Sequence, residues 1–202
     1  MSSTTPNRDR VAEVPYSTPT RTLTGLARRR WPTLAGIAMA GLTAYDLSSG
    51  RELAAILAAS GLVYLGAAAL RKPATAWLLF FGTFLVITPT KVLTDSLDAT
   101  WVFLGLAVLF VAYGLWQGAA RPRDGLPLQA IAMVGFGTTA ALAVLLNEDA
   151  GAYLVAAGLL GHAAWDAYHH RVDRVVVRSM AEFCFVLDTL LAVVIVILTA
   201  RG

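Results

Sequence analysis

The sequence predicts an all-α, polytopic membrane protein, a bundle of seven transmembrane helices. Its 202 residues are 57% hydrophobic and only 14% charged, with a mean hydropathy of +0.64. That composition lies outside the usual range of a soluble domain. Apolar runs of about the length that crosses roughly 30 Å of hydrocarbon follow one another, separated by short polar links. Lys and Arg also gather in alternate links, as in membrane proteins.

Residues 1–30 are rich in Ser, Thr, Pro and Arg and lack hydrophobic periodicity. Ordering them would cost more conformational entropy than burial returns. We therefore predict a flexible cytoplasmic tail over 1–30 and a transmembrane domain over 31–202. A second interpretation is a signal peptide cleaved after Ala38-Met39-Ala40. The apolar run continues past that site, which favours an uncleaved span.

Each predicted span is an apolar run that ends where polar residues begin. The seven spans are 31–47, 53–70, 74–93, 100–117, 126–146, 150–169 and 181–199. Pro89 lies near the end of the third and is expected to kink or end that helix. Glycines recur inside the spans, and small residues allow helices to approach closely in lipid.

The distribution of Lys and Arg predicts the orientation. With the tail inside, only Arg51, Lys91 and Arg201 of the 16 basic residues lie outside, which leaves thirteen inside. Positively charged loops are retained in the cytoplasm. The N-terminus is therefore predicted to be cytoplasmic and the C-terminus outside, in the plasma (inner) membrane.

Two spans begin alike, which suggests an internal repeat. Residues 32–41 read PTLAGIAMAG and residues 127–135 read PLQAIAMVG. Spans one to three and five to seven would then be parallel repeats around span four, a 3+1+3 arrangement found in some transporters. Accidental similarity is the alternative, because Ala, Gly, Leu and Val dominate every span.

The stretch GHAAWDAYHHR, residues 161–171, contains all three histidines of the chain. At about 100° per residue, His162, Asp166 and His169 fall within roughly a 60° arc of one helix, and His170 lies further around. Span six therefore has one polar face near its cytoplasmic end. Such a face could be a metal-free His–Asp hydrogen-bond network that locks spans six and seven. It could also be a proton or substrate relay, because histidine changes charge near neutral pH.

The last span supplies acids at matching depths. Asp188 is expected about as deep as His162, and Glu182 about level with Asp166. A charged side chain at the centre of a bilayer costs about 2.5 to 3.5 kcal/mol, so it usually faces a partner or a water-filled cavity. We therefore predict that Asp188 meets the face of His162 and Asp166 between spans six and seven.

These residues are compatible with three functions. The first is a small carrier or channel-like protein with a His/Asp relay made of His162, Asp166, His169, His170, Asp188 and Glu182. The second is a zinc-dependent membrane hydrolase acting on a lipid-like substrate, because His162, Asp166 and Asp188 form a mixed N/O ligand set that suits zinc. The third is a non-catalytic membrane subunit that assembles with a partner.

The stretch GHAAWDAYHH resembles the histidine boxes of membrane desaturases and fatty-acid hydroxylases. It also resembles the histidine-rich terminal helix of the seven-span hemolysin III and adiponectin-receptor proteins, which would imply a zinc hydrolase with a cytoplasmic N-terminus. Both patterns need further histidines. No histidine precedes Gly161 in the sequence, so no family is assigned.

A group of arginines follows the histidines: Arg171, Arg174 and Arg178. On a continuous helix they would form one stripe, able to contact anionic lipid headgroups. Arg178 could also pair with Glu182, four residues on.

Basic residues elsewhere lie between apolar runs, so nucleic acid is not expected as a partner. A single cysteine, Cys184, excludes an intrachain disulfide.

Overall fold

The computed structural model describes residues 25, 29–45, 47–93 and 98–201. The chain divides into two units, residues 1–30 and residues 31–202, and the second is described below. The predicted tail lies almost wholly outside the described residues.

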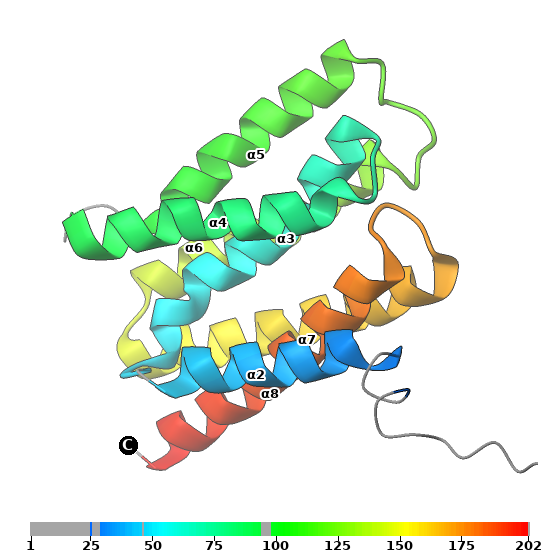
Figure 1. The fold of residues 1–202 in the computed structure, drawn as a ribbon. Helices are drawn as coiled ribbons and strands as arrows, with labels where there is room; N and C mark the ends of the chain where they lie inside the picture. Colours follow the sequence, from blue (N-terminus) through cyan, green and yellow to red (C-terminus); the bar gives the residue numbers. More distant parts are fainter. Residues whose placement is uncertain (1–24, 26–28, 46, 94–97, 202) are drawn as a thin grey trace, which may run out of the picture. The chain divides into compact units, whose positions relative to one another are not determined.

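Within the described part, unit 31–202 is all-helical, with seven α-helices and no strand, as the apolar runs predict. The helices are α2 (Trp31–Tyr45), α3 (Ala54–Leu70), α4 (Thr75–Leu93), α5 (Ala99–Trp116), α6 (Leu126–Leu145), α7 (Glu148–Val172) and α8 (Arg178–Arg201), with a 3₁₀ turn, η1 (Gly50–Leu53), before α3 (Figure 1). Pro89 lies inside α4 and does not end it.

Four segments of the described chain are long and apolar enough to cross a membrane. They are Gly50–Leu70, Ala99–Trp116, Leu126–Leu145 and Arg178–Arg201, and α4 adds a shorter apolar stretch, Thr75–Thr90. The chain therefore has the apolar helices of a membrane-embedded protein. The number of spans and their topology remain predictions.

Helix α3 is the central helix of unit 31–202. In its apolar stretch 83% of the residues are buried, against 28% for both α5 and α6. It packs against α4, α5, α6 and α7. Its sequence, AAILAASGLVYLGAAAL, is mostly small residues. Small side chains let neighbours approach from every side, which explains why this helix is at the centre.

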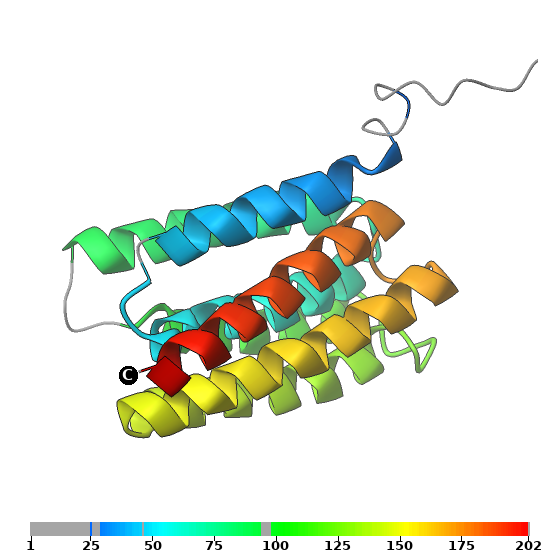
Figure 2. The ribbon, with the colours of Figure 1, turned by 90° about the horizontal axis from the view of Figure 1, so that it is seen from below.

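Helices α7 and α8 pack along each other, and α2 packs chiefly on α8 (Figure 2). Helix α6 packs along α7 and α3. The first three helices and the last three thus have different neighbours, and the 3+1+3 repeat remains a prediction from sequence.

Charged links gather at two opposite ends of the helices. We call one the arginine end; it contains Arg71, Lys72, Arg121, Arg123, Arg171, Arg174 and Arg178. Here Arg174 pairs with Asp124, which joins the α5–α6 link to the α7–α8 link. The other is the Glu148 end, made of residues 48–52, Asp98 and residues 146–149. Here Glu148 pairs with Arg51 and accepts a hydrogen bond from Ser49.

The predicted arginine stripe does not form, because the helix is interrupted between its members. Asp173 ends α7 in the left-handed conformation (φ 53°), and Val175 also has a positive φ of 71°. Arg171 therefore lies on α7, Arg174 lies in the link and Arg178 begins α8. Arg178 pairs with Asp173, with Nε 3.3 Å from Oδ2. The i,i+4 pair predicted for Arg178 is not the one observed.

We expect Gly36→Ala to destabilise the protein by about 1–3 kcal/mol, because extra atoms in a packed interface force helices apart. A Cβ on Gly36 would lie 2.8 Å from the backbone oxygen of Phe183 and 3.1 Å from Cβ of Val186, both on α8. Gly41 is the matched control on the same helix, since its Cβ would meet no atom of the described part of the chain within 4 Å. The measurement is the free energy of unfolding in mixed micelles. Equal values for Gly36→Ala and Gly41→Ala would contradict the close approach of α2 to α8.

Candidate functional site

Helix α7 carries the histidine-rich stretch, and its ends are well defined by local sequence. The side chain of Asn147 accepts a hydrogen bond from the backbone N–H of Ala150, a typical N-cap. Acidic residues occupy the first turn and basic residues the last, which complements the helix dipole. The helix is therefore continuous through His162 and Asp166, which are one turn apart and share a face.

The structure brings His162, Asp166 and Asp188 together in the interior, at the contact between α7 and α8. The Nδ1 atom of His162 lies 2.8 Å from Oδ2 of Asp188 and 3.2 Å from Oδ2 of Asp166. All three residues are 0% exposed. We call His162, Asp166, Asp188 and Tyr64 the His–Asp cluster.

Tyr64 joins this cluster from the central helix α3. Its hydroxyl donates a hydrogen bond to Oδ1 of Asp166 at 2.6 Å, and the residue is 1% exposed. Its ring packs edge-on against the rings of His162 and His169, with centroids 5.3 and 4.9 Å apart. Tyr64 could not be found from spacing along one helix, because its partner is on another helix. The signal that could have found it is its polar hydroxyl in a span whose other residues, apart from Ser60, are apolar or Gly.

His169 belongs to a neighbouring network that is closed on itself. Its Nδ1 donates to the backbone oxygen of Trp165 at 3.0 Å, and its Nε2 accepts from the amide of Gln129 at 3.0 Å. The indole of Trp165 in turn donates to Oε1 of Gln129 at 3.2 Å. Each ring nitrogen of His169 thus has a partner, in the assignment that the neighbouring atoms require. This histidine is explained by packing and hydrogen bonding alone. Gln129 was also missed from sequence.

The other predicted site residues lie elsewhere. Glu182 accepts a hydrogen bond from the hydroxyl of Thr33 on α2 and is half-buried. His170 is half-buried near the end of α7. Cys184 is buried one turn before Asp188, with its sulfur 3.9 Å from the sulfur of Met180. Glu182 and His170 are thus less deeply buried than the His–Asp cluster.

The His–Asp cluster has more polar capacity than its neighbours satisfy. Nε2 of His162, Oδ2 of Asp166 and Oδ1 of Asp188 are buried and have no hydrogen-bond partner among the described residues. Oδ2 of Asp166 does lie 3.2 Å from Nδ1 of His162, close enough for an ion pair but without hydrogen-bond geometry. Buried polar atoms are nearly always paired, so three unpaired atoms in one cluster point to a function other than packing.

The same three residues could hold a metal ion. One ligand atom from each of His162, Asp166 and Asp188 lies within 4.8 Å of the others. An imidazole nitrogen with two carboxylate oxygens is a donor set that zinc accepts, with bonds of about 2.0 to 2.2 Å. To bind an ion at those bond lengths, the three side chains would have to move slightly closer together.

We expect Tyr64→Phe to lower the free energy of unfolding by about 1–3 kcal/mol, because Oδ1 of Asp166 then loses its buried donor. Tyr153→Phe on α7 is the control. Its side chain is 45% exposed, and we expect a change within about 0.5 kcal/mol. Denaturant titration in mixed micelles measures both. If the two variants were equally stable, the contact between Tyr64 and Asp166 would contribute nothing.

Comparison with protein-family models, with curated proteins and with solved structures found no match to this chain. The function proposed below therefore rests on the His–Asp cluster and the helices that hold it.

Proposed function

We propose that this chain is a seven-span membrane protein that binds and relays protons or small cations at its His–Asp cluster, as a small carrier or channel-like protein. The observation that carries this proposal is the set of three buried polar atoms without a hydrogen-bond partner, on His162, Asp166 and Asp188. Such atoms are available to a proton or a cation that moves.

Charge balance supports the same function. A fully ionised cluster would contain two carboxylates and at most one imidazolium, so it would keep a net negative charge in the interior. Removing a charge from water costs several kcal/mol, and mutual attraction repays this only when the charges balance. A bound proton or cation restores that balance. The energetically favourable state of the cluster is therefore the loaded one.

The cluster also joins three helices, α8, α7 and α3. Nδ1 of His162 faces both carboxylates, with Oδ2 of Asp188 at 2.8 Å and Oδ2 of Asp166 at 3.2 Å, so this one nitrogen could exchange a proton with either acid. Tyr64 donates to Asp166 at 2.6 Å. His162 lies ten residues before the end of α7, and Asp188 lies ten residues after the start of α8. At about 1.5 Å per residue this is roughly 15 Å, half the thickness of the hydrocarbon.

The proposed orientation places the arginine end in the cytoplasm and the Glu148 end outside, because positively charged links are retained inside. Arg171, Arg174 and Arg178 are exposed at the arginine end. Anionic headgroups of the cytoplasmic leaflet are the partners that such side chains attract.

Proton flux into liposomes tests the proposal. Purified protein is reconstituted, a membrane potential is imposed, and an interior dye reports the pH. We expect flux with the wild type, flux near background with Asp188→Asn and Asp166→Asn, and wild-type flux with Asp149→Asn, an exposed acid at the Glu148 end. Equal flux in Asp188→Asn and wild type would reject the relay.

A zinc-dependent membrane hydrolase is the second candidate, favoured by the approach of three ligand atoms to within 4.8 Å. A zinc ion held by His162, Asp166 and Asp188 would supply an activated water. The substrate would be lipid-like, because apolar helices surround the cluster.

Metal analysis separates this candidate from the relay. Stoichiometric zinc in the wild type, lost in His162→Ala and Asp166→Ala but retained in His170→Ala, would support the hydrolase. Active wild-type protein without stoichiometric metal would exclude it.

A further inference from the structure

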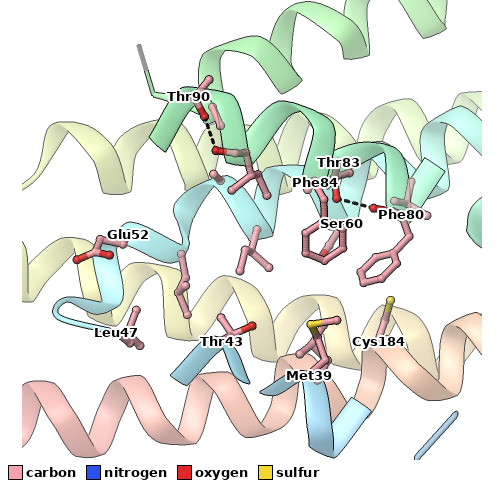
Figure 3. Close-up of a pocket in the computed structure, with 18 of the residues that line it drawn as sticks. Met39, Thr43, Leu47, Glu52, Ser60, Phe80, Thr83, Phe84, Thr90 and Cys184 are labelled. Atoms are coloured by element: carbon pink, nitrogen blue, oxygen red, sulfur yellow. Dashed lines mark hydrogen bonds between the residues drawn. The ribbon is translucent and has the colours of Figure 1, made fainter. Parts of the chain in front are cut away.

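A cavity of about 340 Å³ lies between α2, α3, α4 and α8 (Figure 3). At about 30 Å³ per molecule of liquid water, this is room for on the order of ten waters. Figure 3 shows Glu52 and Cys184 at opposite ends of the cavity, with Thr43, Ser60 and Thr83 between them.

Among the described residues, the charged side chains that line the cavity are both acidic: Glu52 and Asp98, at the Glu148 end. Both also line a second pocket of about 350 Å³, where Glu148 pairs with Arg51. The two pockets therefore adjoin. Clefts lined by one sign of charge raise the local concentration of the opposite ion.

The hydroxyl groups along the cavity favour the same ion. Thr83 donates its proton to the backbone oxygen of Phe80 at 2.7 Å. Thr90 donates to the oxygens of Val86 and Ile87, at 3.0 and 2.9 Å. A hydroxyl has one proton, so each of these oxygens has only lone pairs to offer to the cavity. Lone pairs solvate cations and not anions.

The inner end of the cavity lies beside the His–Asp cluster. Its lining there includes Val63, Cys184 and Leu187. Val63 and Leu187 precede Tyr64 and Asp188 in the chain, and Cys184 lies one turn before Asp188 on α8. None of the four cluster residues lines the cavity, so these side chains separate the two.

We propose that this cavity is the route by which small hydrated cations from the Glu148 end come up to the side chains that separate it from the His–Asp cluster, with Glu52 and Asp98 selecting for positive charge at its mouth. This inference rests on the proposed function, because it supplies the outer half of the pathway that a relay at the cluster requires. It also identifies the substrate class as cationic.

Thiol labelling tests the route without any measurement of flux. In a Cys184→Ser background, Ser60→Cys places one thiol inside the cavity. Two methanethiosulfonate reagents of similar size, one with a trimethylammonium and one with a sulfonate group, are added at the Glu148 end of the protein in oriented vesicles. The ratio of the two rates is divided by the same ratio for a small thiol in solution, because any thiolate reacts faster with a cationic reagent. We expect this normalised ratio to favour the cationic reagent by about tenfold or more. Glu52→Gln with Asp98→Asn should bring the normalised ratio close to one.

The two substitutions at the mouth are conservative. Asp98→Asn keeps the oxygen that accepts from the backbone N–H of Thr100, and Glu52→Gln keeps the oxygen that accepts from Ser48. A fall in the ratio of rates would therefore report lost charge and not a lost helix cap.

Ala192→Cys in the same background is the positional control. Ala192 is 1% exposed on α8, nearer to the Glu148 end than Cys184, and it does not line the cavity. We expect it to remain unlabelled. Equal labelling at residues 60 and 192, no charge preference at residue 60, or faster labelling from the arginine end would each overturn the route. Proton flux that depends on Asp188 would survive those outcomes, so the two proposals fail separately.

Discussion

His162→Leu should lower the free energy of unfolding by about 3–5 kcal/mol, the cost of breaking a buried ion pair by removing one partner. His162 Nδ1 lies within 3.2 Å of a carboxylate oxygen from each of Asp166 and Asp188. Without the imidazole the two acids lose their shared partner, and both are 0% exposed. Titration of chelator-treated protein with SDS in mixed micelles measures the loss.

The triple variant His162→Leu, Asp166→Asn, Asp188→Asn is the matched comparison. It has nearly the same volume and no ionisable group at these positions, so we expect it to recover most of the stability lost by His162→Leu. Recovery would show that the wild-type charges are not kept for stability. A triple variant no more stable than His162→Leu alone would show that shape, not charge, accounts for the loss.

The helices could be predicted because each apolar run is long and is bounded by polar links. The predicted span 100–117 and the helix Ala99–Trp116 differ by one residue at each end. The last helix, Arg178–Arg201, extends beyond the predicted 181–199, because a helix continues past the hydrocarbon into polar residues such as Arg178. The link between the last two spans was predicted from the end of the apolar run at residue 169, but its exact start at Asp173 was not, since neither Gly nor Pro marks it. Asp tolerates the left-handed conformation.

The His–Asp cluster could be predicted only as far as one helix face and depth allow. Spacing of four residues relates His162 to Asp166, and counting from the membrane surface relates both to Asp188. Tyr64 and Gln129 have no such relation to the cluster in sequence. Because α3 is buried on nearly all sides, its sequence has no polar face to reveal which way Tyr64 points. Only the packing of α3 against α7 decides that.

That packing of α3 against α7 makes a second large effect testable. We expect Leu57→Ala to cost about 2–5 kcal/mol, toward the lower value because lipid and not water solvates the apolar surface of the denatured protein. Leu57 is 0% exposed. Its Cδ2 would lie 2.4 Å from a Cβ added at Gly158 on α7, and Thr139 Cγ2 would lie 3.1 Å from that Cβ. Leu57 therefore occupies the space that a side chain at residue 158 would need.

Gly158→Ala should accordingly cost about 1–3 kcal/mol alone and much less when Leu57 is already Ala, because the leucine that obstructs the new methyl group is gone. The coupling between the two substitutions is expected at about 0.5–3 kcal/mol, measured by a double-mutant cycle on the free energy of unfolding. Gly135→Ala with Leu57→Ala is the control pair, since a Cβ on Gly135 meets none of the described residues within 4 Å, and their costs should be additive. Additive costs for Leu57→Ala and Gly158→Ala would mean that α3 and α7 do not meet at this point. Tyr64, two turns further along α3, would then have no fixed approach to Asp166.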